Sequence, residues 1–269
     1  MRLIEDAEKK ELLVDLLARI QEFLKANNIC WFVGGGTMLG AVRHKGFIPW
    51  DDDIDILIPR ADFIRLIHLI EANGKKFAES NMAIVEFDEH KKSYHKKFKI
   101  SDTRTEMIEY GRPRPAVFVD VFPIDNFKTK KSITKNRKKI LALDNMLALV
   151  HSGYVSSSGA KSVVYNILLF IFKIFGLSAV EKKLENRLLK LTAFFENGYT
   201  GGSEGAYGMR EFSKSLCYKN AITLPFENIA VPVPAGYDEI LTNLYGDYMT
   251  PPPPEEYHNH SYYKMYWKD

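Results

Sequence analysis

Cysteine is scarce in this chain, and long apolar runs are missing. Only two cysteines occur among 269 residues, Cys30 and Cys217. A fold held together by several disulfides is therefore excluded, and a reducing compartment is expected. Cys30 lies in an apolar run, which predicts a buried thiol. No stretch reaches the roughly 18 consecutive apolar residues that a membrane-spanning helix needs.

The first ten residues are charged and lack the apolar centre of a secretory signal, so a cytoplasmic location is expected. The most apolar segment, residues 163–177, is interrupted by Asn166 and Lys173. We interpret this segment as a buried helix. The alternative is a helix that lies on the inner face of the cell membrane and gives the protein a peripheral contact there.

Neither sign of charge dominates the sequence. The net charge is +3, and the hydrophobic and charged fractions, 46% and 26%, are ordinary for a globular protein. The weak positive excess is compatible with an anionic substrate or a phospholipid surface. It does not support nucleic-acid binding, so no nucleic-acid partner is expected.

Short β-branched runs alternate with segments of helical periodicity, which predicts an α/β N-terminal half. The expected helices are 12–24, 37–43 with Thr37 as its N-cap, 61–71 and 237–245. The expected strands are 29–33, 54–58, 82–87, 97–101, 117–122 and 229–233. Residues 132–196 are expected to add two or three helices, and the glycine-rich residues 197–208 to form a loop.

The strongest chemical signal is the acidic run within residues 50–56, where four carboxylates fall in five residues. In an extended segment Asp51, Asp53 and Asp55 share one face, while the alternating isoleucines take the core face. Such a column of charge repels itself unless a cation lies on it, and Mg²⁺ prefers oxygen ligands. We interpret Asp53 and Asp55 as a metal-binding pair, with Asp51 and Asp52 outside it or facing solvent.

A further carboxylate, Asp120, interrupts an apolar strand. An acid is costly in such a strand unless it is paired or bound to metal, so Asp120 is predicted to be a third ligand from a neighbouring strand. Two alternatives stay open. The acidic run is a solvated turn and Asp120 pairs with a lysine, or the acids form a calcium loop, although Ile56 then stands where that loop needs glycine.

Three glycines, at positions 34–36, separate the strand at 29–33 from the helix that precedes the acids. Glycine allows the backbone to approach a phosphate closely, and the free amides at the start of a helix favour anions. The glycines and the acids together predict the two halves of a metal-phosphate site.

The run Gly35–Ile56 closely resembles the signature of the LicD family, which includes bacterial phosphocholine transferases and the eukaryotic fukutin-related transferases. Further segments that resemble the family are Lys99–Asp102, Val119–Pro123 and Tyr245–Met249. The sequence lacks the cysteine cluster that binds zinc in fukutin-related members, which favours a bacterial member. The resemblance implies an α+β fold, in which helices flank a nucleotidyltransferase-like mixed β-sheet core and a mainly helical insertion or appendage is added.

The implied organisation is a catalytic core at 1–130, a helical region at 131–205 and a C-terminal segment at 206–269 that packs back on the core and completes the active site. The implied activity is metal-dependent transfer of phosphocholine from CDP-choline to a sugar hydroxyl of a cell-surface glycan, with release of CMP. The acceptor, such as lipopolysaccharide or teichoic acid, is expected to be lipid-linked. The alternatives are CDP-glycerol or CDP-ribitol as donor, or a catalytically silent nucleotide- or glycan-binding module.

The resemblance also implies roles for single residues. Asp53 and Asp55 would bridge two Mg²⁺ or Mn²⁺ ions, and Asp120 would hold the ion nearest the acceptor. Asp120 is also the candidate to accept the proton of the acceptor hydroxyl.

The donor's diphosphate would be held by groups on both sides of the acidic run. Gly35, Gly36 and Thr37 would cradle it, and Arg43 and Lys99 would neutralise charge on its phosphoryl oxygens. The remaining candidates would contact the substrates. These are His44 on the donor, the possible aromatic choline cage of Trp50, Phe122 and Tyr248, and His258 and His260 closing over the site.

Overall fold

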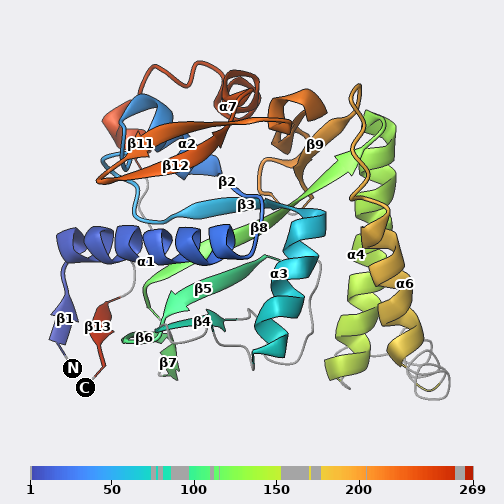
Figure 1. The fold of residues 1–269 in the computed structure, drawn as a ribbon, viewed down its shortest axis with the longest axis horizontal. Coiled ribbons are helices and arrows are strands. Elements are labelled where there is room, and N and C mark those ends of the chain that lie inside the picture. The colour runs from blue at the N-terminus through green and yellow to red at the C-terminus, as the bar shows by residue number, and fades with distance from the viewer. Residues whose placement is uncertain are drawn as a thin grey trace.

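The computed structural model describes residues 2–73, 77, 81–85, 97–109, 112–114, 116–152, 170, 177–203, 205–257 and 264–268. His258, His260 and most of the apolar segment 163–177 lie outside these residues, so their suggested roles stay predictions. Among the described residues, no helix combines the length and apolar character needed to cross a membrane. Helices flank a mixed β-sheet, which confirms the predicted α+β class (Figure 1).

A central sheet carries the acidic run. Its main path is β10-β9-β8-β3-β2, and β5 pairs with both β4 and β8. The pair β3 (Asp55–Pro59) and β8 (Phe118–Phe127) is parallel, whereas the other pairs are antiparallel. The remaining strands of this sheet are β2 (Phe32–Val33), β4 (Met82–Val85), β5 (Phe98–Asp102), β9 (Tyr199–Gly202) and β10 (Phe212–Lys214).

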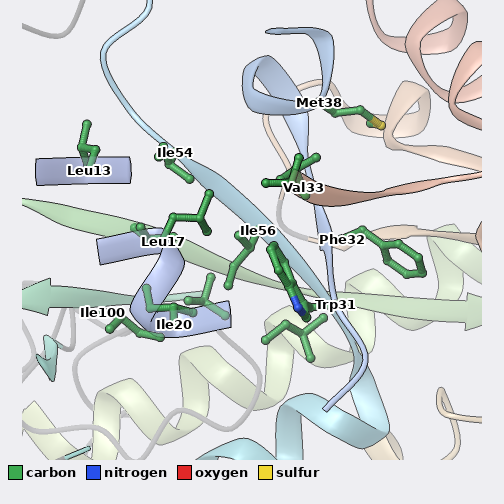
Figure 2. Close-up of a cluster of buried hydrophobic side chains, with 14 of the residues drawn as sticks. Leu13, Leu17, Ile20, Trp31, Phe32, Val33, Met38, Ile54, Ile56 and Ile100 are labelled. Atoms are coloured by element: carbon green, nitrogen blue, oxygen red, sulfur yellow. The ribbon is translucent and has the colours of Figure 1, made fainter. Parts of the chain in front are cut away.

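The hydrophobic core lies between this sheet and α1 (Asp6–Ala26), a helix whose apolar residues recur at three- and four-residue spacing. Ile54, Ile56 and Ile58 are fully buried, which confirms the alternation predicted for the acidic run. Figure 2 shows Leu17 of α1 close to Ile56 within this cluster. The core face of β3 is thus apolar, and its acids are left for the opposite face.

Two long helices, α4 (Lys130–Ser152) and α6 (Leu177–Leu189), lie side by side at one edge of the molecule (Figure 1). Near the end of β8 they enclose a smaller apolar cluster that includes Phe127, Ile133 and Leu188. The helical insertion is therefore observed. Other helices flank the central sheet: α2 (Gly35–Arg43), α3 (Arg60–Ala72) and α7 (Tyr237–Tyr245).

Three local predictions are wrong. The glycine-rich segment 197–208 contains β9, because β8 and β10 supply its pairing partners. A Cβ at Gly201 would overlap the backbone of Glu211, so this glycine allows close packing within the sheet. Helix α2 begins at Gly35 with Gly34 as its N-cap, and Thr37 lies inside the helix. Cys30 is exposed, although Cys217 is buried; both are free thiols.

Strands that no local pattern predicted join distant parts of the chain. A four-stranded sheet has the order β1-β13-β6-β7, and it brings the two ends of the chain together (Figure 1). Its strands are β1 (Arg2–Ile4), β13 (Met265–Trp267), β6 (Thr105–Glu109) and β7 (Arg112–Arg114). The two remaining strands of the described residues, β11 (Ala221–Phe226) and β12 (Ile229–Pro234), pair with each other as a hairpin.

A buried ion pair ties the end of β3 to β8. Arg60, the first residue of α3, donates from Nε to Asp125 Oδ1 at 2.7 Å and from Nη2 to Asp125 Oδ2 at 2.9 Å. The two side chains are 1% and 0% exposed. Ser203, which follows β9, donates its hydroxyl to Asp125 Oδ2 at 2.6 Å. Such a pair is tolerated in the interior because its charges are matched and hydrogen-bonded.

We expect Arg60→Met to lower the free energy of unfolding by about 3–5 kcal/mol, because it leaves the carboxylate of Asp125 buried without its counterion. Urea denaturation measures this loss. Arg65→Met is the matched control, since its ion pair with Asp62 is half exposed and is worth about 1 kcal/mol at most. Equal losses in the two variants would contradict the proposed importance of the buried pair.

Candidate functional site

A cavity of about 780 Å³ opens where the acidic run meets the start of α2. The segment after β9 and the chain from α7 into the prolines form its other walls. Eight predicted site residues line it: Gly35, Gly36, Arg43, Trp50, Asp53, Asp55, Phe122 and Tyr248. The sequence thus identified much of one cavity, although the roles of these residues stay predictions.

Two of the predicted metal ligands are neighbours in the sheet. Asp55 on β3 and Asp120 on β8 are partners in the parallel register. The backbone N–H of Asp120 donates to the carbonyl of Ile54 at 2.9 Å. Side chains at paired positions share one face of a sheet, so the two carboxylates lie side by side opposite the isoleucine face. This placement agrees with a third carboxylate on a neighbouring strand.

Burial and the repulsion of neighbouring carboxylates raise the pKa values of Asp51 and Asp55. Burial raises the pKa of Asp51 to about 7, and the charge of Asp53 adds to the shift. Burial raises the pKa of Asp55 well above its ordinary value, helped by Asp53 and Asp120. Because these pKa values are raised in the folded chain, the acids stabilise it at low pH, and this contribution is lost as the pH rises toward 7.

Asp51 and Asp52 differ more than the sequence suggested. Asp51 lines the cavity and acts electrostatically on Asp55, so it belongs to the acidic cluster. Asp52 forms a salt bridge with Lys9 of α1 and is absent from the described cavity lining. The shared parity of Asp51, Asp53 and Asp55 was the signal that could have included Asp51.

Asp120 has two lysines beside it. Lys99 Nζ donates to Asp120 Oδ2 at 2.8 Å, and Lys97 Nζ lies 4.0 Å from Asp120 Oδ1. Burial lowers the pKa of Lys99, while the carboxylate of Asp120 opposes that shift. Within the described part of the chain, Asp120 Oδ1 is buried without a hydrogen-bond partner. The alternative in which Asp120 pairs with a lysine is therefore observed at Oδ2, while Oδ1 has Lys97 at ion-pair distance but no hydrogen bond from the described residues.

The acids fit a divalent cation in their chemistry. Asp55 is partly buried among three other carboxylates, and one of these, Asp120, has an oxygen without a hydrogen-bond partner among the described residues. A cation would offset this repulsion and satisfy the oxygen. In the described ranges, no group of three or more His, Cys, Asp or Glu side chains is already placed to hold one ion. Asp53 and Asp55 line the cavity, whereas Asp120 lies beside Asp55 in the sheet and is not part of the described cavity lining.

Arg43 joins α2 to the chain beyond α7. Its Nη1 donates to the carbonyl of Tyr248 at 2.6 Å, and its Nε donates to His44 Nε2 at 2.9 Å. The guanidinium lies 6.0 Å from the ring centre of Trp50, which stacks on Tyr257 at 3.6 Å. Burial lowers the pKa of both Arg43 and His44. Arg43 thus presents a positive charge at the cavity wall, while His44 acts as its hydrogen-bond acceptor.

The start of α2 approaches the acids closely. Gly35 has φ +47°, and a Cβ there would lie 2.9 Å from Asp55 Oδ2. Thr37 is 2% exposed, and its Oγ1 accepts the backbone N–H of Asp55 at 2.9 Å. Thr37 therefore fixes the start of β3 against α2, in addition to any contact that it makes with a ligand.

Tyr207, Glu211 and Tyr245 are among the lining residues that sequence reasoning missed. Tyr245 lies in a segment that resembles the LicD family, which was a usable signal. Tyr207 lies near the end of the glycine-rich segment 197–208, which was predicted to be a loop, and Glu211 follows that segment. Their placement depends on β9 and β10, which pair at long range.

We expect Gly35→Ala to destabilise the chain by about 2–3 kcal/mol, because it adds both left-handed backbone strain and a clash with Asp55. Gly208→Ala is the control: Gly208 has φ +63° but a Cβ there meets nothing within 4 Å, so it isolates the backbone term of about 1 kcal/mol. Urea denaturation of both variants measures the difference. Equal losses would show that Gly35 has room for a side chain.

Comparisons with known proteins agree with the fold and with the acidic run. Residues 28–145 match the family model described as the LicD/FKTN/FKRP nucleotidyltransferase domain. A lipopolysaccharide cholinephosphotransferase LicD from Haemophilus influenzae is 27% identical over 96% of this chain and 97% of that relative. Uncharacterised proteins of Rickettsia typhi and Rickettsia prowazekii are 46% and 48% identical over 24% and 23% of the chain, covering 21% and 24% of their own lengths. Residues 28–145 therefore carry a LicD-type nucleotidyltransferase domain, and similarity to a LicD protein extends over nearly the whole chain.

Proposed function

We propose that this protein transfers phosphocholine from CDP-choline to a hydroxyl of a lipopolysaccharide-type glycan and releases CMP. The observation that carries the proposal is the in-register pair of Asp55 and Asp120 beside the glycine start of α2. The near full-length similarity to a cholinephosphotransferase supports the same reaction class. Carboxylates facing a helix start suit a donor whose reacting group is a phosphate.

In the proposed reaction, the acceptor hydroxyl oxygen attacks the phosphorus that bears choline. A P–O bond forms there, and the bond from this phosphorus to the bridging oxygen of the diphosphate breaks. The electron pair leaves with CMP, and the hydroxyl proton passes to a base. Asp120 is the candidate base, because its buried Oδ1 has no hydrogen-bond partner among the described residues.

Asp53, Asp55 and Asp120 are the residues that would hold Mg²⁺ or Mn²⁺. Such ions, when bound, neutralise phosphoryl and leaving-group oxygens. The chain's own acids repel an anionic diphosphate, so they favour donor binding only when their charge is balanced. Arg43 contributes a fixed positive charge at the cavity wall, held there by the carbonyl of Tyr248. Lys99 orients Asp120 through its hydrogen bond to Oδ2.

The same chemistry with CDP-glycerol or CDP-ribitol is the nearest alternative, and a silent nucleotide- or glycan-binding module is the other. A module without catalysis has no need for three mutually repelling acids, one of them the buried Asp120, so we favour an enzyme. Incubating the protein with Mg²⁺ and each CDP-alcohol, with and without lipopolysaccharide, separates these cases by CMP release. Exclusive use of a polyol donor would contradict the choline assignment, and no release from any donor would contradict an enzyme.

We expect Asp55→Asn to lower CMP release at least about 1,000-fold, because it removes a metal-binding charge with little change in shape. Asp52→Asn is the matched control within the same acidic run, since Asp52 pairs with Lys9 and should retain most activity. Mn²⁺ binding, measured by calorimetry, should weaken in Asp55→Asn and persist in Asp52→Asn. Similar effects of the two changes would argue against separate roles.

We also propose that the basic face of α4 contacts an anionic membrane surface, where a lipid-linked acceptor would lie. Six lysines and one arginine occur between Lys128 and Lys139, with no acid among them. The pKa of Lys139 is lowered by the positive charges of Arg187 and Lys135. Unbalanced like charges of this kind favour an anionic partner. Leu141 of α4 and Leu189 of α6 are also exposed apolar side chains.

Reversing three of these charges, Lys135→Glu, Lys138→Glu and Lys139→Glu, should weaken binding to phosphatidylglycerol-containing vesicles by about 100-fold or more, at ~1 kcal/mol per basic residue. Vesicle co-sedimentation measures the change, with phosphatidylcholine vesicles as the uncharged surface. Lys219→Glu is the control, because Lys219 does not belong to this run and lies near an acid, Glu196. Unchanged binding in the triple variant would contradict the membrane contact.

A further inference from the structure

One wall of the cavity has no part in the reaction described above. It consists of Tyr207 and Glu211, around the short 3-10 helix at Gly208–Glu211, and Tyr245 at the end of α7. All three side chains line the same cavity as the acidic run. We call this set the Tyr-Glu wall.

Glu211 is held in place by its surroundings. Its Oε1 accepts the backbone N–H of Tyr207 at 3.1 Å. Gly205 leaves space for this carboxylate, since a Cβ there would overlap Glu211 Oε1. Burial raises the pKa of Glu211, and the nearby charges of Arg137 and Arg210 only partly oppose that shift. The fold therefore keeps a partly desolvated carboxylate beside the cavity.

Two aromatic rings stand next to Glu211. Tyr207 and Tyr245 pack edge to face, with ring centres 5.6 Å apart and an interplanar angle of 80°. Tyr245 also reaches the reacting end of the cavity: its hydroxyl lies 3.9 Å from the position of a Cβ on Gly35, and Asp55 Oδ2 lies 2.9 Å from the same point. The pKa of Tyr245 is raised first by burial and further by Tyr207, Asp55 and Glu211. Tyr245 thus connects the Tyr-Glu wall with the acids.

Aromatic rings and a carboxylate are the groups that bind a quaternary ammonium ion. The ring faces attract a cation electrostatically, and the methyl groups of such a cation tolerate an apolar surface. A desolvated carboxylate adds charge complementarity that a neutral polyol would leave unused. One side chain, Tyr245, separates the acids from the rest of the Tyr-Glu wall. This short separation suits a ligand whose phosphate and cation are close together.

We propose that Tyr207, Glu211 and Tyr245 bind the positively charged head of the donor alcohol and so select choline over neutral alcohols. This inference rests on the proposed phosphocholine transfer, and it assigns the choice of donor to residues separate from the acids. The sequence suggested a choline cage of Trp50, Phe122 and Tyr248. These side chains also line the cavity, but they are not part of the Tyr-Glu wall.

The test compares two donors that differ in charge alone. CDP-choline is paired with the CDP ester of 3,3-dimethylbutanol, in which a carbon replaces the ammonium nitrogen. The wild-type protein should prefer CDP-choline by about 30-fold or more in kcat/KM for CMP release. Glu211→Gln should lower kcat/KM about 30-fold for CDP-choline and leave the neutral donor within about threefold.

The variant Glu211→Gln keeps an amide oxygen that accepts the N–H of Tyr207, so the local fold should persist. Glu227→Gln is the matched control, because Glu227 also accepts a backbone N–H, that of Phe47, and lies outside this cavity lining. It should leave the donor preference unchanged. Tyr207→Leu should reduce the preference, whereas Tyr207→Phe should retain it.

Equal losses for both donors in Glu211→Gln would overturn the inference, because a base or a purely structural residue acts on both alike. Absence of a wild-type preference would overturn it as well. Phosphocholine binding, measured by calorimetry, separates this inference from the proposed reaction. If neither donor releases CMP but phosphocholine binding still depends on Glu211, the Tyr-Glu wall stands and the transfer reaction fails. Binding that is insensitive to Glu211 would overturn the wall.

Discussion

The parallel register between β3 and β8 is the constraint on which the rest of the structure depends. Asp55 on β3 pairs with Asp120 on β8. Arg60, the residue after β3, binds Asp125, and the same separation of 65 residues applies to both pairs. A slip of one residue would turn Asp120 to the isoleucine face and separate Arg60 from its partner. Because the buried ion pair forms only in the observed register, it selects the arrangement that places the two carboxylates side by side.

The two ends of this strand pair are electrostatic opposites. At Arg60 and Asp125 unlike charges meet, and the hydroxyl of Ser203 adds a further hydrogen bond. At Asp55 and Asp120 like charges meet, and one oxygen of Asp120 lacks a hydrogen-bond partner within the described residues. A chain selected for stability alone would not retain the second arrangement. The ion pair of Arg60 and Asp125 stabilises the strand register that places Asp55 beside Asp120. We therefore interpret the ion pair as structural support for the acids.

The sequence predicted what depends on local pattern and missed what depends on long-range pairing. Alternation in the acidic run placed Ile54, Ile56 and Ile58 in the core, and an acid in an apolar strand identified Asp120. The glycines of 197–208 indicated a loop, yet β9 forms there because β8 and β10 supply its partners. Strands β1 and β13 pair across the full length of the chain, so neither short segment carried a recognisable signal.

The cavity is therefore assembled from two kinds of sequence. The acids of residues 51–55, the start of α2 and Arg43 come from one continuous segment, and a family signature therefore finds them readily. Tyr207 and Glu211 reach the cavity only because β9 pairs with β8 and because Gly205 leaves room for a carboxylate. Side chains at such positions can change without disturbing the β3–β8 register, which depends on other contacts. Donor choice in this fold would then vary in the segment after β9 while the phosphate chemistry stays constant, with Tyr245 as the contact shared by both.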